Sequence, residues 1–375
     1  MQLTTFPHRR LISAAALACA ATLIPATALA ATTSPAAPTP GGRTATVPAG
    51  FQPTAASFYS PASGVVLGGV GCATNHACRA RLVATTDGGA RWRFLTAPDV
   101  SLSTISQVAF ASRRDGWLYQ QHSRGLWATH DRGAHWRKLT LGGASIDTVA
   151  ASAGTVYAVV SRSTTDELFR SPAGRAAWAR VGTITGGFGA ALAVSGKAAW
   201  FGPSTVGTHT YLWATADGVH WHKYPFTCPG ADYGLSGIAA ASPSRVAFLC
   251  ANAEGMFHTA KEVLQSVNGG KTEHLTGRAA PQYGDVLGYG AFAVPHRRPR
   301  VVTIAVYTPG PDYLYRSANG GKTWAQIAIP GTEGGPLLGS LSYASRTVGF
   351  VVVSWPPYEL LRTTDAGARW HKVSF

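Results

Sequence analysis

Five carboxylates lie in expected loop segments of the second half of the chain, where a pair of acids could hydrolyse a glycosidic bond. That reaction needs one carboxyl group as the acid and a second as the base or nucleophile, held at a fixed separation. The sequence alone does not bring any two of these carboxylates to that separation. The candidates are Asp232, Asp285, Asp312, Glu333 and Glu359.

Aromatic side chains occur in the same loop segments and suit a surface that binds carbohydrate or peptide. Their flat faces pack against apolar groups, while a few nearby carboxylates orient hydroxyls or amines. Loop aromatics also serve as simple packing anchors, so both interpretations stay open. The binding candidates are Tyr233, Tyr283, Tyr289, Tyr313, Trp355 and Tyr358.

Basic residues form a third group, and the formal net charge of the chain is +15. A basic face on an exported protein predicts docking on an anionic wall polymer, such as a teichoic acid, or on a lipid surface. The alternative is a solvated surface with no ligand. Nucleic acid is not an expected partner, because no known binding motif occurs and the basic residues are dispersed over turns. The candidates for this face are Arg113, Arg114, Arg297, Arg298 and Arg300.

A segment of the type Ser/Thr-x-Asp/Asn-x-Gly-x-x-Trp occurs seven times at intervals of 42 to 51 residues. The candidate residues lie between its copies, so the repeated structure must position them. The third copy, residues 171–178, lacks the acid, the fourth is one residue shorter, and the fifth ends in Glu273 in place of Trp. Such a period on short β-like runs predicts one supersecondary unit repeated in a ring or array. Its members are Asp87, Asp131, Asp217, Asn268, Asn319 and Asp365, with Trp92, Trp136, Trp178, Trp221, Trp324 and Trp370.

The second repeat shows how one unit is expected to fold. Four short apolar runs, at residues 108–111, 117–119, 125–128 and 136–139, predict four strands, with the recurring segment as the turn between the third and fourth. First strands are rich in small residues, as innermost propeller strands must be where sheets converge. The expected fold is an all-β, seven-bladed propeller of four-stranded antiparallel blades.

The recurring segment, which we call the repeat turn, has a structural explanation. Its Asp or Asn can accept hydrogen bonds from the backbone N–H groups that follow, and its Gly supplies the positive φ that closes the hairpin. The Trp packs beneath the turn against the neighbouring sheet. We therefore expect the aspartates of these turns to stabilise the fold rather than to catalyse.

The repeats resemble the Asp-box, or BNR-repeat, propellers, which include sialidases, sortilin-type ectodomains, xyloglucanases and photosystem assembly factors. The assembly-factor blade fits best, on the phrase from Phe110 to Trp136. The resemblance covers residues 51–375 and implies seven blades, with no strand exchange needed to close the ring. That fold serves hydrolases and pure binders alike. The arginine that sialidases carry in a Phe-Arg-Ile-Pro segment before the first repeat turn has no counterpart here.

Composition and the N-terminal residues indicate an exported globular protein. The 375 residues are 46% apolar and 13% charged, enough for a large core. Residues 1–30 have the basic start, apolar stretch and Ala-Leu-Ala site of a signal peptide cleaved after about Ala30, and residues 31–50 resemble a flexible spacer. Neither this apolar stretch nor any later one is long enough to span a membrane. We expect residues 51–375 to form a secreted, monomeric propeller.

Four cysteines remain once the predicted signal peptide is removed. An even number in an exported chain predicts two disulfides, most simply Cys72–Cys78 and Cys228–Cys250. Cys72, His76 and Cys78 could instead bind a metal, but three ligands in one short loop of an oxidising compartment disfavour this. His220 and His222 alternate along an expected strand without a third ligand. No metal and no cofactor is expected.

These observations favour a non-catalytic binding or scaffold module for an extracellular glycan, wall polymer or protein. The alternative is a glycoside hydrolase, either sialidase-like or of the paired-carboxylate type.

Overall fold

The computed structural model describes the chain from residue 47 to its end with eleven internal gaps, and residues 44–375 form one compact unit. Regular structure in the described part is entirely β-strand. The predicted signal peptide and most of the predicted spacer lie outside it. The described ranges are 47–72, 78–103, 105–152, 154–185, 190–203, 210–230, 232–252, 260–279, 292–306, 313–329, 338–354 and 356–375.

Seven four-stranded antiparallel sheets, the blades, follow one another along the chain. Blades 1 to 3 consist of β1 (Phe51–Phe58), β2 (Gly64–Val70), β4 (Arg81–Thr85) and β5 (Arg93–Leu95); β7 (Ser106–Phe110), β8 (Gly116–Gln120), β9 (Leu126–Thr129) and β10 (Arg137–Leu139); and β11 (Ser145–Ser152), β12 (Thr155–Arg162), β13 (Thr165–Pro172) and β14 (Ala179–Thr185). Blades 4 and 5 consist of β15 (Ala190–Ser195), β16 (Ala198–Pro203), β17 (Thr210–Thr215) and β18 (His222–Phe226); and β19 (Tyr233–Ser242), β20 (Arg245–Asn252), β21 (Lys261–Ser266) and β22 (His274–Ala279). Blades 6 and 7 consist of β23 (Phe292–Ala293), β24 (Val302–Val306), β25 (Tyr313–Ser317) and β26 (Ala325–Ala328); and β27 (Leu338–Tyr343), β28 (Gly349–Val353), β29 (Glu359–Thr363) and β30 (His371–Val373).

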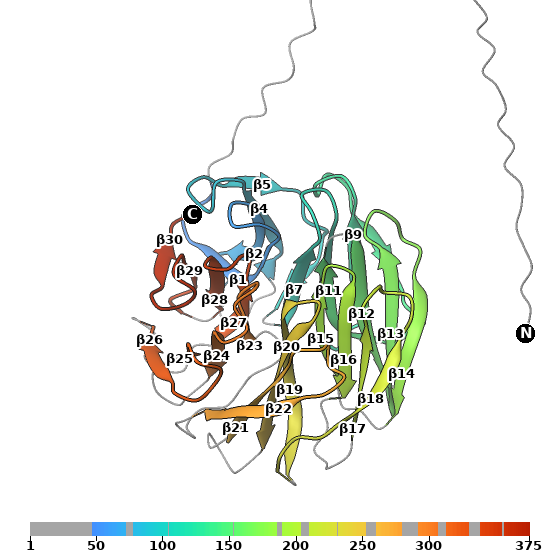
Figure 1. Ribbon diagram of the computed structural model, residues 1–375. Coiled ribbons are helices and arrows are strands. Elements are labelled where there is room, and N and C mark those ends of the chain that lie inside the picture. The colour runs from blue at the N-terminus through green and yellow to red at the C-terminus, as the bar shows by residue number, and fades with distance from the viewer. Residues whose placement is uncertain are drawn as a thin grey trace, which may run out of the picture. The chain divides into compact units, whose positions relative to one another are not determined.

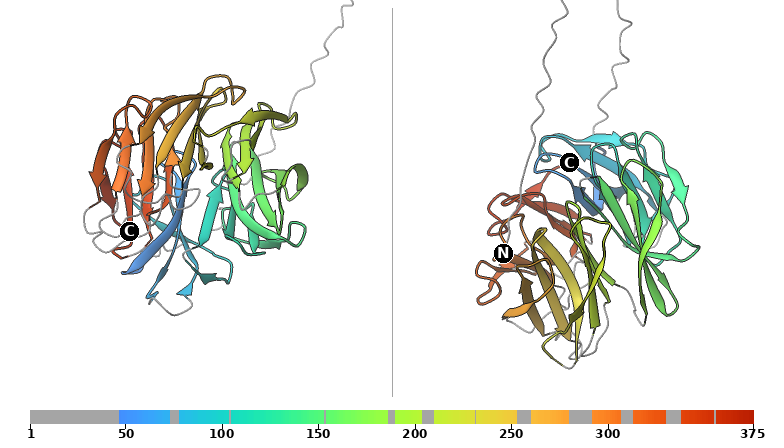
Figure 2. Two further views of the ribbon diagram at one scale, coloured as in Figure 1. Left: turned by 90° about the horizontal axis from the view of Figure 1, so that it is seen from below. Right: turned by 45° about the vertical axis from the view of Figure 1, so that its right-hand side comes forward.

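The first strands of successive blades lie next to one another, from β1 through β7, β11, β15, β19 and β23 to β27. The ring closes because β27 and β28 pack against β1, as the colours from blue round to red show (Figure 1). Figure 2 shows the same succession of blades from two other directions. Each blade takes all its strands from one segment of the chain, so no strand is exchanged. The predicted seven-bladed propeller is confirmed.

The core lies between neighbouring blades rather than inside one of them. Between blades 7 and 1, for example, the buried rings of Phe58 and Phe350 stack with centroids 3.4 Å apart. The two faces of a blade therefore bury their apolar side chains only when the ring is complete, which makes the seven sheets one hydrophobic unit.

The Ser or Thr hydroxyl is the centre of each repeat turn, a role that the sequence analysis did not assign. In blade 1, Thr85 Oγ1 donates to Asp87 Oδ1 (2.9 Å) and accepts the N–H of Gly89 (2.9 Å). Asp87 Oδ1 also accepts the N–H of Arg91 (2.9 Å), as expected. Gly89 has φ 97°, the left-handed conformation that its lack of a side chain permits. The same hydroxyl-to-acid and glycine-to-hydroxyl bonds recur in blades 2, 4, 5, 6 and 7.

The turns between strands 1 and 2 lie at the same end of the blades as the repeat turns. Gly88 N donates to Ala62 O (2.8 Å), and Gly320 N donates to Arg300 O (2.7 Å). Equivalent backbone bonds join the two turns in blades 2, 3, 5 and 7. We call this end of the propeller the repeat-turn face. Basic residues of both kinds of turn lie on it.

The tryptophans of the repeat turns fasten some neighbouring blades and not others. Trp92 Nε1 donates to Ser374 O of blade 7 (2.9 Å), and Trp136 Nε1 donates to Thr96 O of blade 1 (2.8 Å). Trp324 does the same toward Arg278 O of blade 5 (3.0 Å). The buried indole N–H groups of Trp178 and Trp221 have no hydrogen-bond acceptor among the described residues.

Both predicted disulfides are present. Cys72–Cys78 closes a short loop beside a small sheet of β3 (Cys78–Arg79) and β6 (Ser101–Leu102), which the sequence did not predict. Cys228–Cys250 joins the second residue after β18 to β20, and therefore ties blade 4 to blade 5 at the end opposite the repeat turns.

Candidate functional site

A concavity of about 680 Å³ lies on the repeat-turn face between blades 5 and 6. No described residue that lines it is a carboxylate, and five of its lining residues are arginines. We call it the basic groove. Its principal lining residues are Ser242, Arg245, Arg297, Arg298, Arg300 and Arg316.

The loop that carries three of these arginines joins β23 to β24, and hydrogen bonds fix its backbone to two blades. Arg297 N donates to Ala241 O (2.8 Å), and Gln265 Nε2 donates to Pro299 O (2.7 Å), both on blade 5. Arg300 O accepts Gly320 N from the repeat turn of blade 6 (2.7 Å). The guanidinium groups therefore project from a braced backbone, so less conformational entropy is lost when a ligand binds.

Four arginines of the basic groove have no neutralising partner among the described residues. None of Arg245, Arg297, Arg298 and Arg300 forms an ion pair with a described residue, whereas six other arginines or lysines of the described chain do. Burial, with a further contribution from Arg297, holds the pKa of the adjacent His296 below its ordinary value of 6.5. The groove is thus a cluster of permanent guanidinium charge beside a histidine that is neutral at pH 7.

A second concavity, of about 720 Å³, lies between blades 4 and 5 on the same face. Ser242 lines both concavities, so they adjoin. We call the second one the histidine groove. Its walls are the repeat turns of blades 4 and 5, and its principal lining residues are Ala214, Asp217, His220, His222, Tyr224 and Lys271.

Asp217 is the one carboxylate that lines the histidine groove, and its bonds fix it as an anion. The side chain of His220 lies 2.6 Å from Asp217 Oδ2, and this contact and the N–H groups of Val219 and His220 lower the pKa of the carboxyl. The carboxylate therefore belongs to the turn and is not available as a proton carrier. His222 and Tyr224 form the other side, with near-parallel rings 6.1 Å apart.

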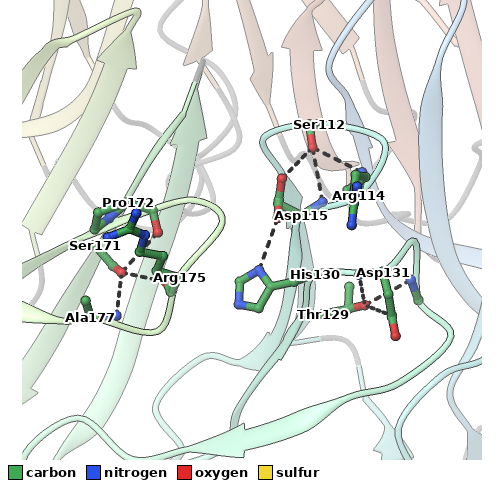
Figure 3. Close-up of polar contacts among 11 residues, drawn as sticks. Ser112, Arg114, Asp115, Thr129, His130, Asp131, Ser171, Pro172, Arg175 and Ala177 are labelled. Atoms are coloured by element: carbon green, nitrogen blue, oxygen red, sulfur yellow. Dashed lines mark hydrogen bonds and ion pairs between the residues drawn. The ribbon is translucent and has the colours of Figure 1, made fainter.

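The predicted arginines of blade 2 do not line either groove. Arg113 and Arg114 lie in the tight turn from Ser112 to Asp115, where Ser112 Oγ donates to Asp115 Oδ2 (2.8 Å) and accepts Arg114 N (3.1 Å) (Figure 3). Asp115 also contacts His130 Nδ1 (3.1 Å), so this turn is bonded to the one beside it (Figure 3). The predicted basic face is divided between two places.

Of the predicted aromatic site, the structure describes Tyr233, Tyr313 and Tyr358, and all three are half-buried. Tyr233 packs over Gly230, where a Cβ atom would fall inside its ring, and Tyr313 packs beside Tyr315 against the core of blades 5 and 6. Tyr283, Tyr289 and Trp355 lie outside the described residues. Tyr233 and Tyr313 are the first residues of β19 and β25, and the binding role of these aromatics stays a prediction.

Only two of the five candidate catalytic carboxylates are described. Asp232 is exposed, and Glu359 is ion-paired with Lys372 Nζ at 2.6 Å. Asp285, Asp312 and Glu333 lie outside the described residues, as does His76. Cys72 and Cys78 are joined in a disulfide, and the described residues contain no group of three or more His, Cys, Asp or Glu that could hold a metal. They also contain no helix that could span a membrane.

No protein-family model matches the sequence, and no curated protein matches it. Solved structures do. The structure of YCF48 bound to D1 peptide is 19% identical, with a TM-score of 0.55 over 85% of this chain and 95% of that one. YCF48 from Cyanidioschyzon merolae is 17% identical, with a TM-score of 0.54 over 86% of this chain and 98% of that one.

A third similar structure is the β-propeller domain of the Trilobed protease from Pyrococcus furiosus, described as having an open velcro topology. It is 8% identical, with a TM-score of 0.51 over 88% of this chain and 97% of that one. These likenesses show the fold. The chain belongs to the β-propellers.

The sequence analysis missed the histidine groove. It treated His220 and His222 as a pair without a third ligand. The available signal was the fifth repeat, where Glu273 replaces the Trp that fastens other blades.

Proposed function

We propose that the protein is an exported, non-catalytic binding or scaffold module that holds an extracellular anionic ligand on its repeat-turn face. The observation that carries this proposal is the basic groove, where five arginines line one concavity without any described carboxylate. Guanidinium groups bind carboxylate and phosphate through paired, charge-assisted hydrogen bonds. A braced loop with unneutralised charge is what such a site requires.

Export is supported by the two disulfides, because disulfides persist in oxidising compartments. We further infer that the repeats are of the Asp-box type. The support is the bond pattern of the Ser/Thr hydroxyl, the acid and the glycine, which recurs in six of the seven turns.

Glycoside hydrolysis gains no specific support from the described residues, since they include only two of the five candidates and one of these, Glu359, is ion-paired with Lys372. One similar propeller, YCF48, is described as bound to a D1 peptide, and this keeps a peptide among the ligands to be tested.

The test compares two triple variants that lose the same charge. The first carries Arg297→Gln, Arg298→Gln and Arg300→Gln, and the second carries Arg113→Gln, Arg114→Gln and Arg132→Gln. The salt needed to elute each protein from phosphocellulose and from isolated cell-wall material is measured. The groove triple is expected to bind at least tenfold more weakly than the wild type, because the loss of even one charge-assisted bond, worth roughly 1.5 kcal/mol or more, weakens binding about tenfold.

The blade 2 triple is expected to retain most of the binding, and binding by the wild type should weaken as salt screens the charges. Equal losses in the two triples would show that net charge alone causes retention, and the proposed groove would then be wrong.

A further inference from the structure

One side chain that lines the histidine groove is short where the equivalent side chains of blades 5, 6 and 7 are long; blades 1 and 2 also carry alanine there (Ala84 and Ala128). The residue just before the Ser or Thr of the repeat turn reaches the next blade wherever it is long. Gln265 bonds to Pro299 O and Arg316 Nε to Ala366 O, each at 2.7 Å, while the guanidinium of Arg362 lies against Gly88. In blade 4 this residue is Ala214, which lines the groove instead of filling it.

The walls of the histidine groove offer one flat side and several hydrogen-bonding groups. His222 and Tyr224 project from alternate positions of β18, with ring planes inclined by only 27°. Lys271 and Ser244 lie across from them, on the repeat turn and on the strand 1–2 turn of blade 5. A flat aromatic side facing polar groups suits a ring that has C–H groups on its face and hydroxyls at its edge.

Apolar side chains are exposed at the two turns that wall this groove. Val219 is 62% exposed and Val267 is 57% exposed, more than the other large apolar residues of the described chain. They lie in the repeat turns of blades 4 and 5 respectively. Neither valine lines the groove itself, so these side chains add exposed apolar surface beside it.

We propose that the ligand is a sugar-bearing phosphodiester polymer that crosses both grooves, with its sugar in the histidine groove against His222 and Tyr224 and its phosphate on Arg297, Arg298 and Arg300. This inference rests on the proposed function and names its ligand class. The shared residue Ser242 makes the two grooves adjoin, so neighbouring groups of one chain can occupy them together. Two weak contacts joined in this way bind much more tightly than either alone.

Phosphate fits the basic groove better than carboxylate does. Arginines line the groove from the start of β20 and from the loop 297–300, while the guanidinium of Arg316 on β25 already donates to Ala366 O. A tetrahedral phosphate presents oxygens in more than one plane, whereas a planar carboxylate presents two oxygens in one plane. Polymers of acidic amino acids or uronic acids are therefore the competing outcomes.

The experiment measures the affinity of the full chain for poly(glycerol phosphate) with and without sugar substituents. The wild type is expected to bind the glycosylated polymer about fivefold more tightly, the effect of one added aromatic contact. Ala214→Gln should abolish this preference and leave binding of the bare polymer unchanged. Gln265 already occupies the same position in blade 5, so the fold accommodates the change.

Two further variants control for the folding of Ala214→Gln. Ala84→Gln makes the equivalent change in blade 1 and should keep the full preference, while His222→Ala, at an exposed residue, should reduce it. The inference is overturned if the wild type binds both polymers equally, if Ala214→Gln weakens both to the same extent, or if polyglutamate or polygalacturonate binds more tightly. No binding of the bare polymer at all would instead overturn the proposed function.

Discussion

The junction of blades 7 and 1 and the junction of blades 4 and 5 are equivalent places in the fold, but different contacts hold them together. Between blades 7 and 1, Trp92 reaches Ser374 O and Arg362 lies on the turn of blade 1, while Phe58 stacks on Phe350 below them. These contacts, together with the packing of β27 and β28 against β1, join the first and last blades with no shared strand.

Between blades 4 and 5 the equivalent positions hold different residues. Glu273 replaces the Trp of the other repeat turns, and Ala214 replaces the long side chain that crosses to the next blade from blades 5, 6 and 7. The two blades are joined by Cys228–Cys250 at the end opposite the repeat turns and by Trp200 Nε1, which donates to Gly269 O in the repeat turn of blade 5 (2.8 Å). This junction is therefore fastened at both ends, and the histidine groove lies between the two repeat turns.

Removing the Cys228–Cys250 disulfide is expected to have the largest effect on the stability of the protein. The double variant Cys228→Ser, Cys250→Ser is expected to lose about 3 kcal/mol of unfolding free energy, because its 22-residue separation strongly limits the unfolded chain. The pair Cys72→Ser, Cys78→Ser, separated by only 6 residues, should lose about 2 kcal/mol.

Urea unfolding of both double variants and the wild type measures these losses. A larger loss from the Cys72 pair would mean that the junction of blades 4 and 5 does not depend on its disulfide.

A smaller effect separates the two kinds of tryptophan. Trp92→Phe removes the indole N–H that bonds to Ser374 O, while Trp221→Phe removes one that has no described acceptor. Both changes delete the same ring area. The first should therefore destabilise the protein by about 1 kcal/mol more than the second, the net worth of one hydrogen bond.

Thermal and urea unfolding of the two variants checks this difference. Equal destabilisation would indicate that the ring packing, and not the hydrogen bond, fastens blade 1 to blade 7.

The propeller could be predicted because its signals are local and repeated. Asp87 and Gly89 dictate a tight turn by their own hydrogen-bonding and backbone preferences, and six further copies at a near-constant interval identify the ring. The Ser/Thr hydroxyl was present in the same pattern, but its bonds depend on a turn geometry that sequence does not show. The small sheet of β3 and β6 has only two residues a strand and gave no periodic signal.

The candidate site could be predicted only in part, because it depends on contacts between blades. The basic loop at residues 296–300 is visible as a charge run, and the structure places it in a groove. The histidine groove depends in part on the short Ala214, and this has meaning only once the long Gln265 and Arg316 are seen to cross to the next blade. The aromatic candidates were chosen by residue type and by their expected loop position. Their binding role stays a prediction, and the described Tyr233 packs over Gly230.

The smallest expected effect is a pH dependence confined to the junction of blades 4 and 5. Burial raises the pKa of the half-buried Glu273 above its ordinary value of 4.5, against an opposing hydrogen bond from the backbone of Thr227. A raised pKa means that the stability contributed by the neutral form is complete below pH 4.5 and is lost as pH rises through the folded-state value. Trp92, at the equivalent position of blade 1, has no ionisable group.

Glu273→Gln removes this titration. The difference in melting temperature between this variant and the wild type should shift in favour of the variant as pH rises from 4 toward 7. The shift should be roughly 2 °C at most, because the carboxyl keeps partial access to solvent. Trp92→Phe, measured in the same series, should differ from the wild type by a constant amount. If Glu273→Gln also differs from the wild type by a constant amount at every pH, the carboxyl ionises as freely as it does in the unfolded chain. The junction of blades 4 and 5 is then more open at Glu273 than the burial of this side chain indicates.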